Sequence, residues 1–364
     1  MRAIRRAVII GNGFAGAENQ CIGLVRALGL SNNYILYRVS RPRGGINERL
    51  HWLPVSVHKR LDHAIKWISG KQVVPFPSQG KDVLEADATS IAKLAQETLK
   101  RDGPLLVVAS GRDTIAVASS VKRLAPQNVF LVQIQHPRSR LNRFDLVITP
   151  EHDYYPLMPE AQEQIPFFLR RWVTPRNPPD KNVVLTVGAL HRADSDALRN
   201  AAFAWHDEMA WLPKPLLVVS VGGPTHLARQ LTDSLKSVLQ TCGSLRISFS
   251  RRTPKIIMDV ITDELSDHPK VYIWNGEESQ KDVARVLLEA GFTSSHYYPN
   301  PHMKPVYVIG AERCTWKFSH FLKTLQRRGA ISDKWLYTPL NDTENAADEV
   351  IKALAERGWK LMPH

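Results

Sequence analysis

The sequence GNGFAG at residues 11–16 has the spacing of residues that bind phosphate. It follows an apolar run at 7–10 and precedes a helical pattern. Rossmann-type folds bind dinucleotides with this G-x-G-x-x-G spacing, because the glycines let a phosphate approach the backbone at a helix N-terminus. Gly11, Gly13 and Gly16 are therefore candidate phosphate-binding residues. A tight strand-to-helix turn that binds nothing would use the same glycines.

The remainder of a dinucleotide signature is incomplete. An acidic residue about 20 residues further on should bind the ribose hydroxyls. Residues 37–45 contain no Asp or Glu and instead hold Arg38, Arg41 and Arg43. Arginines would suit a 2′-phosphate, so NADP stays open, but Glu18 falls in the first helical turn, where an acid opposes a pyrophosphate. The sequence therefore weakens the case for NAD(P).

Two further candidates follow strands in the first half. Arg112 lies in SGRDT, after the apolar run LLVVA, and a guanidinium there could bind phosphate or carboxylate with two parallel hydrogen bonds. The alternative is a helix cap with a local pair to Asp113. His136 ends the next apolar run and is a candidate general base or ligand contact, although a lone histidine is more often structural.

In the second half, Gly222 and Gly223 form a glycine turn after one strand, and Ser250 and Arg251 follow another. Backbone N–H groups from the first turn and the guanidinium of Arg251 or Arg252 could together bind a diphosphate. The sequence has no Ser-His-Asp order, P-loop or HExxH motif, so we assign no catalytic residue and no cofactor.

No metal site is assigned either. Asp145 and the cluster at 151–153 (Glu, His, Asp) have ligand-type side chains without paired spacing, which favours a solvated loop. Cys21, Cys242 and Cys314 lie far apart, which suits buried thiols in a reducing compartment.

The charge distribution indicates anionic partners. Residues 1–178 hold 25 Lys and Arg against 14 Asp and Glu, and residues 179–364 hold 23 against 21, so most of the net +13 lies in the first half. Phosphates, acidic lipids or acidic proteins would be attracted, although a solvated basic surface has the same composition. The cations are scattered and no nucleic-acid-binding signature occurs, so nucleic acid is not expected.

The length and hydropathy pattern indicate a folded protein that does not span a membrane. No apolar run approaches the roughly 18 residues needed to cross a bilayer. The first strand begins almost at once, so neither a signal peptide nor an organelle presequence is expected. Membrane contact should therefore be peripheral or through a partner.

Short apolar runs alternate with helical patterns along the chain, which favours an α/β fold with parallel sheets. The expected strands are residues 7–10, 34–39, 105–109, 129–134, 146–148, 183–187, 215–221, 245–249, 271–274 and 306–309. The expected helices include residues 21–28, 86–100, 226–240 and 345–357. A proline-rich stretch at 171–180 predicts two Rossmann-like domains, 1–178 and 179–364. This organisation is similar to that of GT-B glycosyltransferases.

Several stretches together resemble plant mitochondrial fission factors of the elongated-mitochondria (ELM) type, whose wider family has a glycosyltransferase-like appearance. The resemblance runs from about residue 5 to 277 and resumes at Lys304. The stretches are GNGFAGAENQCIGLVRALGL, RPRGGINERLHWLPVSVHKRLD, SGRDT, QIQHPRSRLNRFDLVITPEHDYY, LTVGALH and RISFSRRTP.

The resemblance implies a non-enzymatic adaptor in mitochondrial fission. Such a factor is peripheral on the cytosolic face of the mitochondrial outer membrane, with a cytosolic pool, and helps bring a dynamin-related GTPase to fission sites. The alternative from the fold is a GT-B-type nucleotide-sugar glycosyltransferase, and an NAD(P)-dependent oxidoreductase is the weakest hypothesis. The sequence does not determine the oligomeric state.

One segment departs from the resemblance. Residues 279–298 intervene after Glu278, and the PNPHM stretch at 299–303 joins directly to Lys304. The family has about a strand and a helix at this point, which need roughly 20–30 residues. By the resemblance, that missing piece would form the donor-side wall of a cleft. The helical pattern at 281–290 could replace part of it; otherwise the second domain is incomplete.

We therefore predict that the second domain is the less stable of the two. Limited proteolysis of the full chain should cut first near residues 279–303, because a missing sheet strand leaves neighbouring residues poorly packed. Fragments identified by mass spectrometry would locate the cut. A second domain that resists protease and unfolds cooperatively would contradict the prediction.

Overall fold

A computed structural model describes residues 2–39, 84–138, 140–167, 175, 177–192, 195–222, 228–249, 253–274, 308, 316–328 and 340–362. The chain divides into two compact units. Unit 1 comprises Met1–Arg192, Tyr307–Ile331 and Leu340–His364, and unit 2 comprises Ala193–Val306 and Ser332–Pro339. Within the described ranges, no helix is long and apolar enough to cross a membrane.

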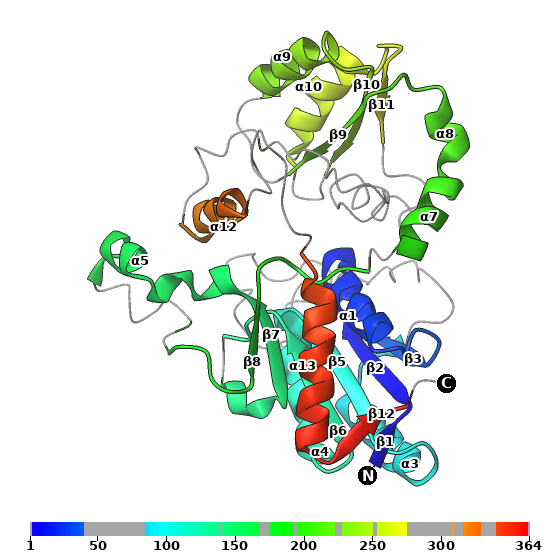
Figure 1. Cartoon of the computed structure of the whole chain (residues 1–364), viewed down its shortest axis with the longest axis vertical. Coiled ribbons are helices and arrows are strands. Elements are labelled where there is room, and N and C mark those ends of the chain that lie inside the picture. The colour runs from blue at the N-terminus through cyan, green and yellow to red at the C-terminus, as the bar shows by residue number, and fades with distance from the viewer. Residues whose placement is uncertain are drawn as a thin grey trace, which may run out of the picture. The chain divides into compact units, whose positions relative to one another are not determined.

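Unit 1 is built on a seven-stranded parallel sheet with strand order β4-β3-β2-β5-β6-β7-β8 (Figure 1). The strands are β2 (Arg6–Gly11), β3 (Tyr34–Arg38), β4 (Leu84–Glu85), β5 (Leu105–Ser110), β6 (Val129–Ile134), β7 (Leu146–Pro150) and β8 (Val183–Thr186). Val, Ile and Leu dominate β5 and β6, and every residue of these two strands is buried. Continuous apolar strands of this kind need helices on both faces of the sheet.

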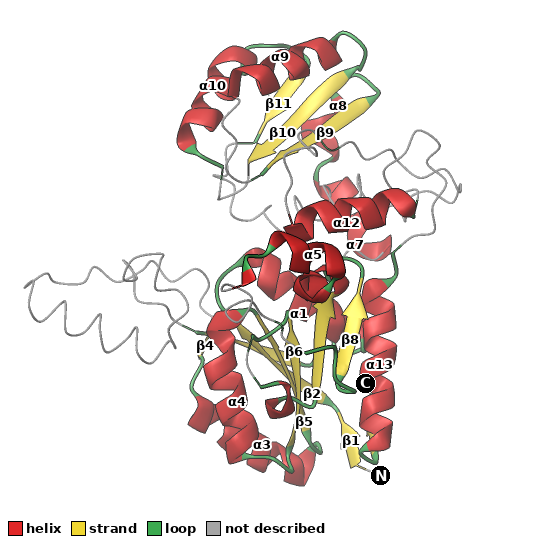
Figure 2. Cartoon of the chain, turned by 90° about the vertical axis from the view of Figure 1, so that its left-hand side faces the viewer, coloured by secondary structure: helices red, strands yellow, loops and turns green. Residues whose placement is uncertain are grey.

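Two pairs of helices cover the two faces (Figure 2). Helices α1 (Ala15–Ala27) and α13 (Asp342–Glu356) pack on one face, and α3 (Ala88–Arg101) and α4 (Ile115–Leu124) pack on the other. The two cores contain alternate residues of the same strands, such as Val108 in the first and Val107 in the second. Unit 1 is therefore a three-layer Rossmann-like domain.

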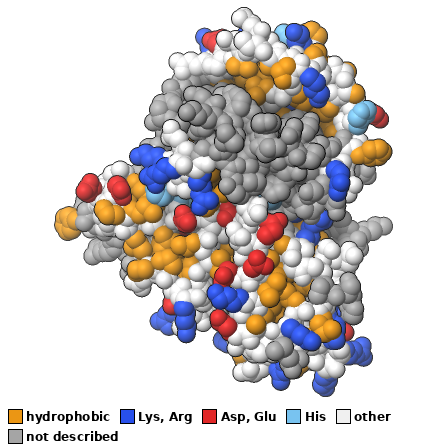
Figure 3. Space-filling model, viewed as in Figure 1, with side chains coloured by type: hydrophobic (Ala, Val, Ile, Leu, Met, Phe, Trp, Pro, Cys, Tyr) orange, Lys and Arg blue, Asp and Glu red, His pale blue; other side chains and the backbone are white. Residues whose placement is uncertain are grey.

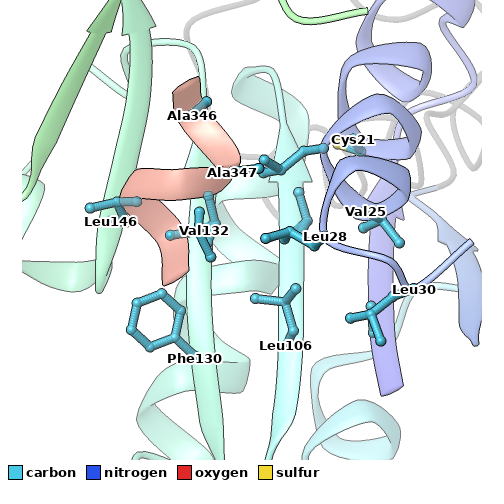
Figure 4. Packing of buried hydrophobic residues seen from close by; sticks show 14 of the residues in the cluster. Cys21, Val25, Leu28, Leu30, Leu106, Phe130, Val132, Leu146, Ala346 and Ala347 are labelled. Atoms are coloured by element: carbon cyan, nitrogen blue, oxygen red, sulfur yellow. The ribbon is translucent and has the colours of Figure 1, made fainter. Parts of the chain in front are cut away.

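The C-terminal helix completes the core of unit 1. Figure 4 shows Ala347 of α13 beside Cys21 of α1, and Ala346, Val132 of β6 and Leu28, the residue after α1, belong to the same cluster. Next to this helix, the terminal strands β1 (Arg2–Ile4) and β12 (Trp359–Leu361) form a small parallel sheet of their own. Both ends of the described chain thus belong to unit 1.

The observed division differs from the expected domains, 1–178 and 179–364. Strand β8 pairs with β7, so the first unit continues to Arg192 rather than ending at the proline-rich stretch. The C-terminal helix, expected in the second domain, belongs to unit 1 because its apolar face fits against α1. Hydrophobic periodicity predicts such a helix but not the sheet on which it packs.

A nearly buried carboxylate fixes the far end of α13. Asp145 Oδ1 accepts from Lys122 Nζ at 2.8 Å and from Arg357 Nη1 at 2.7 Å, and its Oδ2 accepts from the N–H of Leu131 at 2.7 Å. The Asp145 side chain is only 17% exposed. The residue expected in a solvated loop therefore joins α4, β6 and the C-terminal segment.

The start of α13 is bonded to the segment that follows β8. Asp342 accepts the N–H groups of Val187 and Gly188 at 3.1 and 2.7 Å, and the Thr343 hydroxyl bonds to both the N–H and the carbonyl of His191. Residues 187–192 and 340–343 are the unit 1 ends of two connections to unit 2. These two connections are therefore held together within unit 1.

Unit 2 has a smaller parallel sheet among its described residues, with strand order β11-β10-β9. Its strands are β9 (Leu216–Val221), β10 (Ser244–Phe249) and β11 (Val271–Ile273), and its helices are α7 (Ser195–Ala204), α8 (His206–Ala210), α9 (Ala228–Leu239) and α10 (Lys255–Leu265). Helices α9 and α10 contribute Leu235 and Ile261 to the core. The fully buried Arg246 lies 5.3 Å from the ring centre of Trp205.

These units confirm the α/β class and the two Rossmann-like units. The shortened segment at 279–303 and its expected helix at 281–290 lie outside the described residues, as does all of the expected strand at 306–309 except Val308.

We predict that Gly23→Ala destabilises unit 1. A Cβ at Gly23 in α1 would lie 2.2 Å from the backbone carbonyl oxygen of His191, so either the helix or the connection must shift. Overpacking of this kind costs about 1–3 kcal/mol. Urea denaturation followed by circular dichroism would measure the loss.

Gly16→Ala is the matched control in the same helix. No described atom lies within 4 Å of a Cβ at Gly16, so alanine should leave stability unchanged or raise it by up to about 1 kcal/mol through helix propensity. Equal effects of the two substitutions would contradict the contact with His191.

Candidate functional site

The topology of the unit 1 sheet places its candidate functional site at one edge. The chain leaves β2 towards β3 and β4 and then returns to β5 on the other side of β2. In open parallel sheets, ligands bind outside the carboxyl ends of the strands at such a switch point. We call the loops that follow β2, β3, β5, β6 and β7 the carboxyl edge.

At the carboxyl edge, the glycine loop after β2 binds a carboxylate of its own chain. Glu18 of α1 accepts the N–H of Gly13 at 2.8 Å, and a Cβ at Gly11 would lie 2.4 Å from the same carboxylate oxygen. Gly11 therefore provides space for Glu18, which is 5% exposed. The positive φ of 77° at Gly13 also favours glycine, because other residues are strained there.

The Glu18 carboxylate is neutralised by an arginine at the end of β3. Arg38 donates from Nε and Nη2 to the two oxygens of Glu18, both at 2.7 Å, and these hydrogen bonds raise the pKa of Arg38. This pair occupies the position at the helix N-terminus where a Rossmann domain binds a pyrophosphate. Phosphate binding by Gly11 and Gly13 would require Glu18 to move away, and Gly16 lies apart in open space.

The loop after β5 carries Arg112 on a fixed backbone. Gly111 has a φ of 83°, and its carbonyl oxygen accepts from the Nε2 of the fully buried Gln133. Asn12 Nδ2 donates to Asp113 Oδ2 at 3.4 Å, which joins the loops after β2 and β5. Arg112 itself is exposed. Partial burial and the charge of Arg138 lower the pKa of Arg112, and Asp153 and Asp113 raise it, so the structure brings these two cations near two carboxylates.

The loop after β6 has an unusual backbone. Gln135 and Arg138 have φ values of 70° and 52°, which are uncommon for residues other than glycine. The N–H of Arg138 donates to His136 Nδ1 at 3.0 Å, and the imidazole meets the ring of Tyr154 edge to face at 5.4 Å. Burial lowers the pKa of His136, which is therefore neutral at pH 7 and carries its proton on Nε2.

The cluster at residues 151–153 is also ordered by partners. It lies in the 3-10 helix η4 (Glu151–Leu157), which packs against α12 (Trp316–Arg327). Asp153 accepts from Thr149 Oγ1 at 2.9 Å and from Lys317 Nζ at 3.0 Å. The segment expected to be a solvated loop is therefore held by hydrogen bonds to Thr149 and Lys317. Among the described residues, no group of three or more His, Cys, Asp or Glu side chains could hold a metal ion.

The second candidate site is described in part. Strands β9 and β10 are neighbours, so the loops after them begin side by side. The Thr253 hydroxyl donates to the carbonyl of Val221 at 2.8 Å, and no described atom lies within 4 Å of a Cβ at Gly222. Gly223, Ser250 and Arg251 lie outside the described residues.

The buried thiol of Cys21 has the structural role that the sequence favours. Its side chain is fully buried in the core under α13, and burial raises its pKa well above the usual range. Cys242 is half-buried, and Cys314 lies outside the described residues.

Arg112 and His136 are candidates from the sequence, and the structure adds two neighbours at the carboxyl edge that the sequence did not indicate, Arg138 and Lys317. Arg138 stands two residues after His136. Its positive φ of 52° could not be predicted from the sequence, because arginine does not favour that backbone conformation. Lys317 bonds to Asp153 across 164 residues of sequence, and only the fold makes them neighbours.

Comparison with known proteins gives two close matches in sequence. The model of the family described as mitochondrial fission ELM1 matches residues 15–293 and 302–354. The mitochondrial fission protein ELM1 of Arabidopsis thaliana is 52% identical over 397 residues, covering 98% of this chain and 93% of the relative. Because 397 exceeds the 364 residues of this chain, the alignment contains positions that have no counterpart here.

Similar solved structures are distant in sequence. A UDP-GlcNAc 2-epimerase from Neisseria meningitidis, bound to UDP-GlcNAc, is 12% identical with a TM-score of 0.45, covering 97% of this chain and all of that one. A UDP-N-acetylglucosamine 2-epimerase from Rickettsia bellii is 9% identical with a TM-score of 0.40, covering 97% and 96% of the two chains. At these values the structures carry no argument about ligands of this chain.

We predict that Glu18→Ala destabilises unit 1. The substitution leaves the guanidinium of Arg38 and the N–H of Gly13 without their acceptor in a largely buried position. A hydrogen bond to a charged group contributes about 1.5–3 kcal/mol to stability. We therefore expect the free energy of unfolding, measured by urea denaturation, to fall by an amount of that order.

The control is Glu349→Ala, which removes an exposed partner of Lys352 in α13. Exposed pairs contribute little, so this change should stay below about 1 kcal/mol. A Glu18→Ala protein as stable as the control would show that the Glu18–Arg38 pair does not hold the loop.

Proposed function

Because the chain belongs to the mitochondrial fission ELM1 family, we propose that it is a non-enzymatic adaptor that helps bring a dynamin-related GTPase to the mitochondrial outer membrane. The family gives the chain a role in mitochondrial fission and an association with mitochondria. The observation that carries the proposal is the 52% identity with the Arabidopsis thaliana protein, which extends over 98% of the chain and therefore over both units.

The proposed location is the cytosolic face of the outer membrane, in exchange with a cytosolic pool. The net charge of +13 supports it, because each Lys or Arg near an anionic membrane contributes about 1 kcal/mol of attraction. On the face shown in Figure 3, Lys and Arg side chains are interspersed with Asp and Glu side chains. Attraction of this face would therefore depend on the sum of many weak contributions, which suits a reversible association that salt weakens.

The glycine loop argues against the oxidoreductase hypothesis, the weakest of the three. In unit 1, the position at which a Rossmann domain binds a pyrophosphate holds the Glu18 carboxylate and its partner Arg38. One observation favours the alternative, a GT-B-type glycosyltransferase: Gly222 directly follows β9 of unit 2, and no described atom lies within 4 Å of a Cβ placed there. A nucleotide-sugar diphosphate could approach the backbone there.

In cells that lack the protein, we expect elongated mitochondria and fewer foci of the dynamin-related GTPase on them. Expression of the full chain should restore both, and the GTPase should co-precipitate with a tagged copy. Fluorescence microscopy of mitochondrial length and immunoblotting of the precipitate measure these outcomes. Normal mitochondrial shape in cells without the protein would end the proposal.

A Gly222→Leu variant separates the adaptor from the transferase. The side chain would obstruct the backbone at the end of β9, so a transferase that binds its donor there would lose function. An adaptor should restore mitochondrial length as well as the unchanged chain does, at equal protein level. Failure of this variant to restore length, with GTPase co-precipitation intact, would favour the transferase.

A further inference from the structure

We propose that the carboxyl edge of unit 1 binds a phosphate group, carried by a soluble small molecule or by a lipid headgroup, through Arg112 and Arg138. The proposal concerns a site to which the role in fission assigns no ligand, and it does not depend on that role.

The position of the two arginines is the first support. Arg112 follows β5, one of the two strands at the switch point of the sheet, and Arg138 follows the adjacent strand β6. Ligands of open parallel sheets bind at this place. The glycine loop on the other side of the switch point is closed by Glu18, so an incoming anion would meet the loops after β5 and β6 instead.

The charge balance of the carboxyl edge is the second support. Arg38 is paired with Glu18, and Lys317 is paired with Asp153. In contrast, neither Arg112 nor Arg138 forms an ion pair with any described residue, and both side chains are exposed. Partial burial and the repulsion from Arg138 lower the pKa of Arg112, and the attraction of Asp153 and Asp113 offsets them only in part, so a bound anion would further stabilise the charged guanidinium.

The backbone of the two loops is the third support, because it is fixed before any ligand arrives. Gln133 donates from Nε2 to the carbonyls of Gly111 and Ile134, at 3.3 and 2.9 Å, and so ties the loop after β5 to the end of β6, from which the second loop begins. Gln135 and Arg138 hold left-handed backbone conformations. Unfavourable conformations of this kind persist where the surrounding structure imposes them, and they concentrate at ligand sites.

The donors available point to phosphate. Each guanidinium can bind two oxygens of one phosphate, and the neutral His136 adds an N–H donor at Nε2, because its Nδ1 accepts from Arg138. These three groups offer donors and no acceptor. Two cations suit the double charge of a phosphate better than the single charge of a carboxylate.

The test is isothermal titration calorimetry of the full-length protein with inorganic pyrophosphate at low ionic strength. Saturable binding is expected, with acetate giving none. Arg112→Ala and Arg138→Ala should each weaken it by about tenfold, the loss of one charge-assisted contact. Arg112→Lys should give an intermediate loss, because it keeps the charge without the two-pronged geometry.

Arg143→Ala is the matched control. Arg143 is an exposed arginine just before β7, at the opposite edge of the same sheet, so its removal changes the net charge equally. It should leave pyrophosphate affinity unchanged. Thermal unfolding by circular dichroism verifies that every variant is folded. No saturable binding to the wild type, or an equal loss in Arg143→Ala, would overturn the proposal.

Co-sedimentation with phosphatidylcholine vesicles, with and without phosphatidic acid, identifies the carrier of the phosphate. If vesicle binding requires phosphatidic acid and is lost in Arg112→Ala and Arg138→Ala, the site recognises a lipid headgroup. If these variants lose pyrophosphate but keep vesicle binding, the ligand is soluble. Mitochondrial length in cells is a separate measurement, so failure here leaves the adaptor proposal intact.

Discussion

The contact between the start of α13 and the segment after β8 is the constraint on which unit 1 depends. Asp342 accepts the N–H groups of Val187 and Gly188, more than 150 residues earlier in the chain. Between these points the chain forms unit 2 and the segment of unit 1 that contains α12, and only afterwards does α13 supply Ala346 and Val350 to the first core. Unit 1 therefore cannot complete its core from the first half of the sequence alone. Loss of the C-terminal residues would expose the apolar face of α1.

The same principle, pairing between residues distant in sequence, determines what the carboxyl edge can bind. A glycine loop before a helix is open to an anion unless the chain itself provides one. Here Glu18 is one turn into the helix and Arg38 ends the next strand, so the loop closes on an internal carboxylate. The glycine motif at residues 11–16 therefore serves packing in this structure. Gly11 is needed because any larger side chain would collide with the Glu18 side chain.

Much of the fold could be predicted from the sequence because strands buried on both faces are continuous apolar runs. The expected strand at 129–134 is β6, and the expected strand at 34–39 is β3 to within one residue. Membership of α13 in unit 1 could not be predicted, since an amphipathic pattern does not specify its partner. At the site, Arg112 was a candidate from its place after a strand. Arg138 and Lys317 were missed because their positions depend on loop conformation and on a contact across 164 residues.

An anion site can exist beside so many carboxylates because most of them are already neutralised. Arg38, Arg112, Arg138 and Lys317 face Glu18, Asp113 and Asp153, so these groups sum to a single positive charge. The flanking pairs Arg38–Glu18 and Lys317–Asp153 contribute little net field, because each partner cancels the other at short range. Asp113 accepts a hydrogen bond from the neutral Asn12 and keeps its charge, so the two guanidiniums exceed the remaining carboxylate by the one positive charge that an incoming phosphate would meet. An adaptor on this scaffold would thus keep a ligand site without the glycine-loop contacts that a Rossmann enzyme uses.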